Sequence, residues 1–115
     1  MYLNDVKLIG EVRDDAPLKT LVANDDTILS FVLVTTENFK NRNGEMMTRK
    51  EAHRVTAFNN VAKSAAPEGT LFAGTEVLVE GFLRSRETGG FLVTEVIARR
   101  IQTTSRAGSA SPAVD

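Results

Sequence analysis

The sequence has no cysteine, no tryptophan and a single histidine among its 115 residues. Without cysteine, a disulfide framework, a thiolate metal site and a thiol nucleophile are all excluded. One chain also cannot supply a multi-histidine metal site, although several subunits could contribute one imidazole each. A serine–histidine–acid arrangement through His53 is formally possible, but His53 lies in a dense strand pattern that favours a packed or interface imidazole. We therefore expect no enzyme, no catalytic residue, no metal and no cofactor.

Long hydrophobic runs are also missing. No apolar segment approaches the roughly 20 residues that a membrane-spanning helix requires, and no charged-then-apolar leader follows Met1. We therefore expect a cytoplasmic protein with no membrane partner. The length of 115 residues fits one domain with a single modest core, and 42% hydrophobic and 25% charged residues are ordinary for a globular chain.

Net charge is low as well, at −1, which argues against a uniformly basic nucleic-acid binder. Its distribution is uneven, however. Residues 1–38 contain three basic and seven acidic residues, a balance of −4, whereas residues 39–101 contain ten basic and seven acidic residues, a balance of +3. The concentration of positive charge in the middle and second half favours an anionic partner at that part of the surface.

Short β-forming segments separated by turn signals fill the first half of the chain. Residues 3–13 predict a strand with a bend or bulge at Gly10. Residues 18–23 predict a second short strand that ends in a tight hairpin at 24–26. The nearly continuous apolar run at 27–36 predicts a strand buried on both faces, in a core and against a partner subunit.

The second half predicts three more strands and one helix. Residues 37–47 are polar and predict a long hairpin loop, after which residues 48–58 form the next strand. Asn59 is expected to cap a short helix with its body at 61–66. Two strands at 75–85 and 91–101 follow, joined by a turn at 87–90. The remaining residues, rich in Ser, Ala, Gly and Thr, predict a disordered tail.

Five principal strands with one short helix between the third and fourth is the order of an OB-fold, an all-β, five-stranded Greek-key barrel. An SH3-like barrel or a sandwich would supply the strands but accounts less naturally for the helix. We therefore expect an OB-fold domain over residues 1–101 and a tail over residues 102–115.

The strand at 48–58 carries the clearest functional signal. Alternation places Ala52, Arg54 and Phe58 on one face and His53 on the other. A guanidinium and an aromatic ring on one exposed face suit single-stranded nucleic acid, because one pairs with phosphate and the other stacks on a base. The alternative is that Phe58 belongs to the core and Arg54 is a solvated strand residue.

Three segments of the chain resemble the bacterial single-stranded DNA-binding protein family. They are Val6–Asp15 (VKLIGEVRDD), Glu51–Phe58 (EAHRVTAF) and Val77–Arg86 (VLVEGFLRSR). The resemblance implies sequence-independent binding of single-stranded DNA in replication, recombination or repair, close to the nucleoid. It also implies a homo-oligomer, a tetramer in preference to a dimer, and no catalysis or metal.

The expected DNA contacts combine base stacking with basic backbone contacts. By position, Phe39 matches the family's hairpin aromatic, Phe58 the end of its third strand and Phe91 an aromatic of the later hairpin. The resemblance also puts His53 at a subunit contact. The basic candidates for backbone contacts are Lys40, Arg42, Arg49, Arg54, Lys63, Arg84 and Arg86. The other phenylalanines, Phe31, Phe72 and Phe82, are assigned to the core or an interface.

The chain departs from the family pattern in three respects. Ala52 stands where the family has a large aromatic, tryptophan is absent, and residues 111–115 lack the acidic, phenylalanine-ended tip that recruits replication and repair proteins. We therefore expect weaker binding per subunit, as in a short or divergent phage, plasmid or primosomal relative. The alternative function is an oligomeric OB-fold interaction or primosomal module whose single-strand binding is weak or lost.

Overall fold

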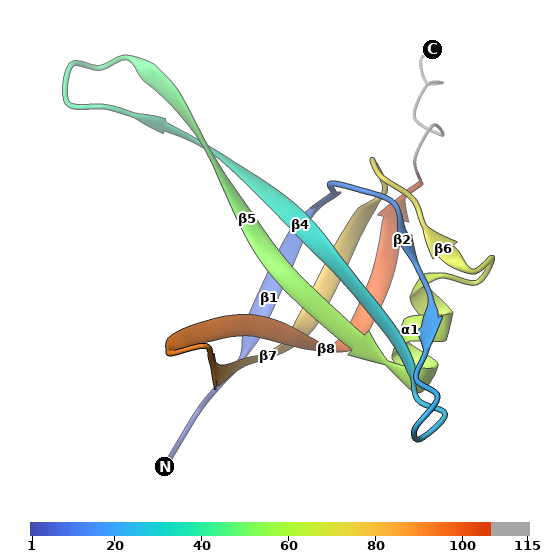
Figure 1. The fold of residues 1–115 in the computed structure, drawn as a ribbon. Helices are drawn as coiled ribbons and strands as arrows, with labels where there is room; N and C mark the ends of the chain where they lie inside the picture. The colour runs from blue at the N-terminus through green and yellow to red at the C-terminus, as the bar shows by residue number, and fades with distance from the viewer. Residues whose placement is uncertain (107–115) are drawn as a thin grey trace.

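Five long strands wrap into a barrel in the computed structural model, which describes residues 1–106 (Figure 1). The elements, in chain order, are β1 (Val6–Val12), β2 (Ala16–Pro17), β3 (Lys19–Thr20), β4 (Thr27–Lys40), β5 (Met46–Phe58), α1 (Asn59–Ala65), β6 (Thr70–Leu71), β7 (Glu76–Thr88) and β8 (Phe91–Ser105). The main sheet has the order β1-β7-β8-β5-β4-β3, and a small second sheet pairs β2 with β6.

Strand β1 closes the barrel because it changes partner along its length. It runs antiparallel to β7 from Val6 to Glu11, and its end pairs with β4 through Glu11 and Val12. The contact between β5 and β8 is parallel and short, with Val55 opposite Val96. A closed five-stranded barrel with a helix between its third and fourth long strands is an OB-fold, so the expected fold class is confirmed.

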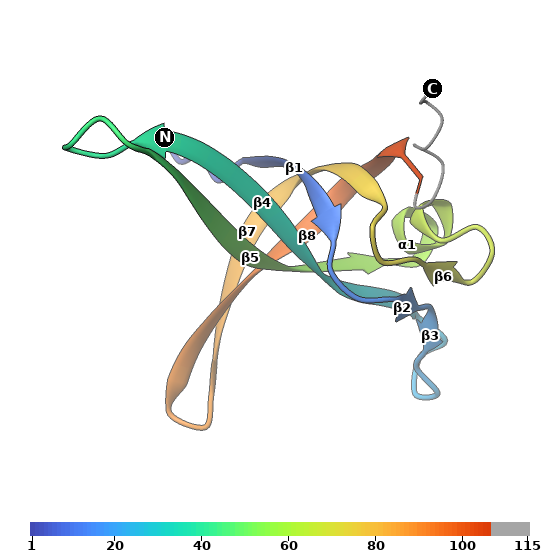
Figure 2. The same cartoon turned by 90° about the horizontal axis from the view of Figure 1, so that it is seen from above.

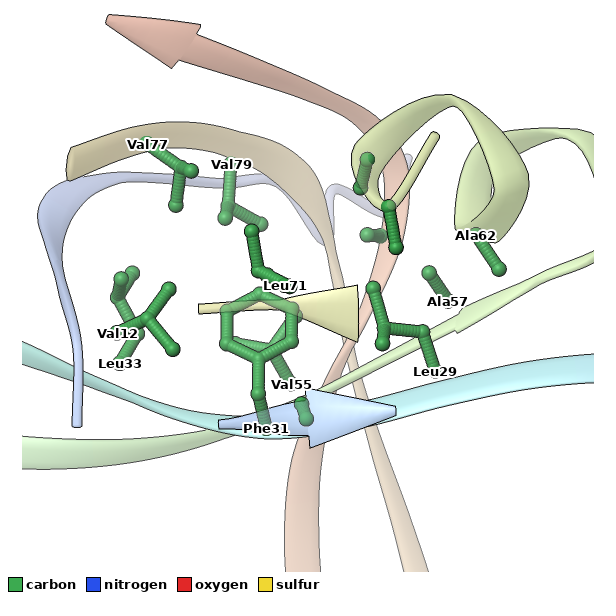
Figure 3. Packing of buried hydrophobic residues seen from close by; sticks show 14 of the residues in the cluster. Val12, Leu29, Phe31, Leu33, Val55, Ala57, Ala62, Leu71, Val77 and Val79 are labelled. Atoms are coloured by element: carbon green, nitrogen blue, oxygen red, sulfur yellow. The ribbon is translucent and has the colours of Figure 1, made fainter. Parts of the chain in front are cut away.

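One face of each long strand fills the barrel, as Figure 3 shows. Alternate residues are buried in the first half of β4, Val55–Ala57 are buried in β5, and Leu29, Leu33 and Val55 are fully enclosed. Each such side chain stabilises the fold by about 1.5–3 kcal/mol relative to exposure. Helix α1 is part of the same cluster through its small residues Ala62 and Ala65, so it covers the barrel rather than standing apart from it.

Two hairpin arms project from the barrel, one formed by β4 and β5 and the other by β7 and β8 (Figures 1 and 2). The β4–β5 pairing continues without interruption to Lys40 opposite Met46, and the β7–β8 pairing continues to Thr88 opposite Phe91. The long loop expected at 37–47 is therefore wrong. Only residues 41–45 form a turn there, because the Asn41 side-chain oxygen accepts hydrogen bonds from the backbone N–H groups of Asn43 and Glu45.

Of the bend or bulge expected at Gly10, the bulge is wrong, since the register of β1 on β7 runs through Gly10 unbroken. Gly10 permits a close approach between strands. A Cβ at Gly10 would fall on the backbone carbonyl oxygen of Val34, where β1 crosses onto β4. Gly81 has the same role against the carbonyl of Ile97. The register shifts of the sheet lie instead in the β7–β8 pairing, at Glu76/Val77 and Glu80/Gly81.

Asn59 does not cap the helix as expected. The N-cap position belongs to Phe58 and has no side-chain hydrogen bond. The Asn59 side chain instead accepts from the backbone N–H of Thr27 and donates to the carboxylate of Asp26, at 3.0 and 3.3 Å. It thereby ties the start of α1 to the start of β4, which fixes the end of the strand that carries Phe58.

Two further expectations change at element ends. The second strand shrinks from 18–23 to Lys19–Thr20, because residues 21–26 form a turn closed by Leu21 and Asp26. The 27–36 run is buried on its core face and half-buried or exposed on its other face in the single chain, so the expected burial of that second face against a partner subunit stays a prediction. Strand β8 extends to Ser105, so residues 102–105 are not tail; residues 107–115 lie outside the described part of the chain. No helix among the described residues is long and apolar enough to cross a membrane.

Candidate nucleic-acid interface

A groove of about 400 Å³ lies on the outer face of the barrel where four strands meet. Its lining comes from β4 (Ile28, Ser30, Phe31, Val32), β5 (Arg54, Thr56, Phe58), β7 (Arg84, Arg86) and β8 (Glu95). A larger hollow of about 570 Å³ lies beside the end of α1, but it contains none of the residues expected to contact DNA. The groove is therefore the candidate site.

The register of β4 on β5 sets the floor of the groove. Thr56 pairs with Ser30, and the neighbours Arg54 and Phe58 on the same face pair with Val32 and Ile28. The intervening residues point into the barrel, so the alternation expected from the sequence is present. Phe58 is half-buried in the groove rather than enclosed in the core cluster. One face of its ring thus lies beside the side chains of the groove.

Glu95 is a buried carboxylate, 6% exposed, at the centre of this lining. Its Oε1 accepts a hydrogen bond of 2.8 Å from the Thr56 hydroxyl, and its Oε2 accepts one of 3.3 Å from Arg84 Nη2. The same Oε2 lies 3.7 Å from Arg86 Nη1. Because Thr56 donates to Glu95, the Ser30 hydroxyl at 3.4 Å is left to donate to Thr56.

The ionisation of Glu95 reflects two opposed effects. Burial raises the pKa of its carboxyl, because the charged form loses hydration. The hydrogen bonds from Thr56 and Arg84 and the charges of Arg86 and Arg84 together lower that pKa by more, so it lies below the ordinary value. Glu95 is therefore an anion at neutral pH and cancels one of the three positive charges that Arg54, Arg84 and Arg86 bring to the groove.

Arg84 also connects the cluster to the aromatic side of the groove. Its guanidinium carbon lies 5.9 Å from the centre of the Phe58 ring, within the range of a cation–π contact. Arg54 contributes an exposed cation and makes no ion pair within residues 1–106. The groove thus offers a ring beside guanidinium groups, the two kinds of group that bind single-stranded nucleic acid.

The β4–β5 arm carries a second group of expected contacts. Phe39 is half-buried, and the guanidinium carbon of Arg49 lies 4.6 Å from the centre of its ring. Arg49 also approaches the Glu37 carboxylate at 3.5 Å. Lys40 and Arg42 are exposed near the end of this arm. Phe39 is therefore a strand residue covered on one side by arginine, not the free loop aromatic that the sequence indicated.

The remaining expected contacts do not join either group. Lys63 is exposed in the last turn of α1, and Phe91 is 74% exposed at the end of the β7–β8 arm. Ala52 is exposed opposite Val34, between the groove and the arm. The residues expected from the sequence thus lie in four places: the groove, the β4–β5 arm, the β7–β8 arm and α1. The groove contains Arg54, Phe58, Arg84 and Arg86.

His53 is half-buried, and its Nε2 lies 2.9 Å from the Thr35 hydroxyl on the neighbouring strand. Of the phenylalanines assigned to a core or an interface, Phe31 is in the core and Phe82 is half-buried under Arg99, whereas Phe72 is 48% exposed. No group of three histidine, aspartate or glutamate side chains in residues 1–106 is placed to hold a metal ion.

Sequence reasoning missed Glu95 and its hydrogen bond with Thr56. One signal was available, because Glu95 is the one charge in the segment Val93–Ala98, which is otherwise apolar except for Thr94, at the position where the strand enters the barrel. A charge in such a run must find partners, since an unpaired buried carboxylate is costly. Its partners Arg84 and Arg86 lie on β7, and the register of β7 on β8 could not be derived from the sequence alone.

The barrel and its groove define an OB-fold binding domain. The model of the single-strand binding protein family matches residues 3–104, so the chain belongs to that family. It is 34% identical over 84 residues to Single-stranded DNA-binding protein 1 of Chlorobaculum tepidum, a match that covers 73% of this chain and 50% of that protein. It is 32% identical over 90 residues to the single-stranded DNA-binding protein of Neisseria meningitidis, covering 78% and 50%. The chain thus spans about half the length of these relatives.

Solved structures agree on the fold. The Plasmodium falciparum SSB in complex with ssDNA superposes with a TM-score of 0.74 at 25% identity, over 90% of this chain and 96% of that one. A deletion mutant of the Thermus aquaticus single-stranded DNA binding protein gives a TM-score of 0.79 at 24% identity, over 94% and 52%.

Proposed function

We propose that the protein binds single-stranded DNA without reading its sequence, with the groove as the central contact. The observation that carries this proposal is the meeting of Phe58, Arg54, Arg84 and Arg86 on one outer face of the barrel. A base stacked on Phe58 would leave its phosphates beside the guanidinium groups. Because every base has a π-face and every nucleotide a phosphate, such contacts do not select a sequence.

The β4–β5 arm extends this surface in our proposal. Arg49, Lys40 and Arg42 would track the backbone, and Phe39 would stack a base on the ring face that Arg49 leaves open. Phe91 would add a ring from the β7–β8 arm. Lys63, in the last turn of α1, would contact the DNA backbone outside the groove and the arms. The expected roles in replication, recombination or repair, and a cytoplasmic, nucleoid-associated location, follow from this activity.

We further propose that the protein acts as a homo-oligomer, a tetramer in preference to a dimer. Within the described residues, Val6–Gly10 of β1 pair on one side only, with β7, because β4 joins β1 only from Glu11 onward. An open strand edge is available for a second chain. The half-buried His53, next to Thr35, is assigned to a subunit contact.

The alternative, an interaction or primosomal module with little single-strand binding, is favoured by Ala52. This exposed residue leaves the face between the groove and the arm without a ring. Single-strand binding predicts clear affinity for oligo(dT), whereas the interaction module predicts little or none. A titration with oligo(dT) therefore decides between them.

That experiment is a fluorescence titration of the purified protein with labelled oligo(dT) at two salt concentrations. The proposal predicts saturable binding that weakens steeply with salt, with a slope of about −0.7 in log K per log salt for each phosphate contacted. A double Arg54→Gln, Phe58→Ala variant should bind much less, while Lys19→Gln, an exposed cation on β3 outside the groove and the arms, should bind as the wild type does. Absence of binding, or equal binding by the double variant, would contradict the proposal.

A further inference from the structure

Among the described residues, Glu95 is the one carboxylate in the lining of the groove, and Arg84 and Arg86 both approach it. Arg84 Nη2 and Arg86 Nη1 approach the same oxygen, Oε2, at 3.3 and 3.7 Å. Two guanidinium groups repel one another, so they share an oxygen only because it carries negative charge. Without that charge the two side chains would separate.

The contacts to Glu95 leave most of each guanidinium available. An arginine has five N–H donors, and each of these pairs involves a single nitrogen. The side chains of Arg84 and Arg86 remain 46% and 56% exposed. Their other donors are therefore accessible to a ligand in the groove, while the carboxylate restricts where the two groups lie.

The carboxylate is itself held in place. Thr56 donates to Oε1 at 2.8 Å, and Ser30 stands behind Thr56 at 3.4 Å, so a chain of hydrogen bonds crosses from β4 through β5 to β8. The same Thr56 is the neighbour of Phe58 on the groove face of β5. The position of the arginine pair is thus coupled to the strand that carries the ring.

We propose that Glu95 is a positioning residue for single-strand binding, which holds Arg84 and Arg86 as a pair that meets the backbone phosphates of a base stacked on Phe58. This inference rests on the proposed function. Arginine side chains lose much rotamer freedom when they bind, and a pair that is already held loses less. Glu95 therefore raises affinity although its own charge repels phosphate.

Simple charge counting predicts the opposite effect. If Glu95 were only a negative charge in the groove, Glu95→Gln would add one net positive charge, tighten binding and steepen its salt dependence. If Glu95 positions the arginines, the same change weakens binding, because a neutral amide does not hold two guanidinium groups together. The sign of the effect distinguishes the two roles.

The test is a titration of wild type and Glu95→Gln with labelled oligo(dT) over a series of salt concentrations. We expect the dissociation constant of Glu95→Gln to rise about tenfold, as for two side chains that must be ordered on binding. We also expect the salt slope to become shallower by about 0.7 for each phosphate that the arginine pair no longer neutralises. Equal or tighter binding by Glu95→Gln would overturn the inference.

Glu80→Gln is the matched control. Glu80 also contacts two cations, Lys7 at 3.8 Å and Arg100 at 3.2 Å, but it does not line the groove. Glu80→Gln raises the net charge by one, as Glu95→Gln does, but it leaves the arginine pair in place. We therefore expect Glu80→Gln not to weaken binding. A reduction in affinity equal to that of Glu95→Gln would mean that the effect is not specific to the arginine pair.

A double-mutant cycle and a second variant complete the test. In an Arg84→Gln, Arg86→Gln background, Glu95→Gln should no longer weaken binding, and the loss of its own repulsion of phosphate should leave affinity equal or slightly higher. Thr56→Val removes the hydroxyl that anchors Glu95 without altering any charge, and we expect an affinity about threefold lower. If Glu95→Gln does not fold, the affinity of Thr56→Val decides whether Glu95 positions the arginines.

The outcomes separate this inference from the proposed function. If the wild type itself does not bind oligo(dT), the proposed function fails. If the wild type binds and neither variant is weaker, only this inference fails.

Discussion

Phe39 and Phe58 lie on the same β4–β5 hairpin but on opposite faces of it. The register is unbroken from Ile28 opposite Phe58 to Phe39 opposite Met47, and Phe39 shares its face with the buried Phe31. The two positions are eleven residues apart along β4, which at about 3.3 Å per residue places them roughly 35 Å apart along the ribbon. One DNA strand that reaches both rings must therefore run along the arm for roughly that distance.

We predict that Phe58→Ala weakens binding to short and long oligo(dT) alike, whereas Phe39→Ala weakens binding only to the long one. Each stack that is removed is expected to reduce the binding free energy by about 1–3 kcal/mol. An oligomer of about 8 nucleotides lies within the usual site size of an OB-fold, about 4–16 nucleotides, and one of about 30 nucleotides exceeds it. Because the rings are distant, the two effects should add. Unchanged nanomolar binding by the double variant would refute stacking on these rings.

A ring at position 52 should restore a missing contact. Ala52 is exposed on the groove face of β5, two residues before Arg54. We expect Ala52→Phe to strengthen oligo(dT) binding by about 1–3 kcal/mol, since the side chain can stack a base without displacing a buried group. Ala73→Phe, at an exposed alanine away from both arms, is the control and should leave affinity unchanged. If both variants bind more tightly by the same factor, added hydrophobicity rather than position explains the result.

Removal of His53 should shift the oligomer toward smaller species. The side chain is half-buried and is held by Thr35 at 2.9 Å, so it can present a fixed surface to another subunit. We expect His53→Ala to lower the average mass at micromolar concentration in sedimentation velocity. Thr35→Val, which removes the hydroxyl partner and keeps the imidazole, should have a smaller effect. An oligomer that stays intact in His53→Ala would rule out the interface role.

Gly81→Ala should destabilise the barrel. Its Cβ would fall on the Ile97 carbonyl oxygen, so the β7–β8 pairing must shift. We expect a decrease of about 1–3 kcal/mol in the free energy of unfolding, or a thermal midpoint lower by about 5–20 °C. Ser64→Ala, at an exposed position of α1, is the control and should cause no decrease. A stable Gly81→Ala variant would mean that the strands can separate at this point without cost.

The stability that Glu95 contributes should disappear in acid. Because the native pKa of Glu95 lies below its ordinary value, the unfolded chain takes up the proton first as the pH falls. The contribution is complete above the unfolded pKa of about 4.3 and is lost as the pH falls through the native pKa. We therefore expect wild type to melt above Glu95→Gln at pH 7 and the difference to shrink below about pH 4. A difference that stays constant down to about pH 3 would contradict this.

The sequence was sufficient for the fold because alternation and element order are local signals. The face that carries Arg54 and Phe58, the short helix after Phe58 and the five long strands all follow from residue periodicity. The resemblance to the single-strand binding family, expected from three segments, is confirmed by the match over residues 3–104.

Errors arose where a partner strand decides the outcome. The polar segment 37–47 looks like a loop, but cross-strand pairing continues it as strand up to Lys40. Asn59 looks like a helix cap, but its side chain finds Thr27 in the neighbouring strand. At Gly10 the bulge alternative is wrong, and the approach of Val34 that requires glycine there is not visible in the chain order. The pairing of Glu95 with Arg84 and Arg86 depends on the β7–β8 register in the same way.

The two projecting arms have a consequence for how this protein can change. Residues such as Lys40, Met46 and Phe91, on strands that continue beyond the core cluster, and Arg42, in the turn between two of them, are exposed, so their side chains support no barrel packing. Substitutions there should alter ligand affinity while leaving the melting temperature nearly constant. The molecule thus separates the residues that keep it folded from those that set how tightly it holds a strand, and the second set can be tuned by engineering while the first is left intact.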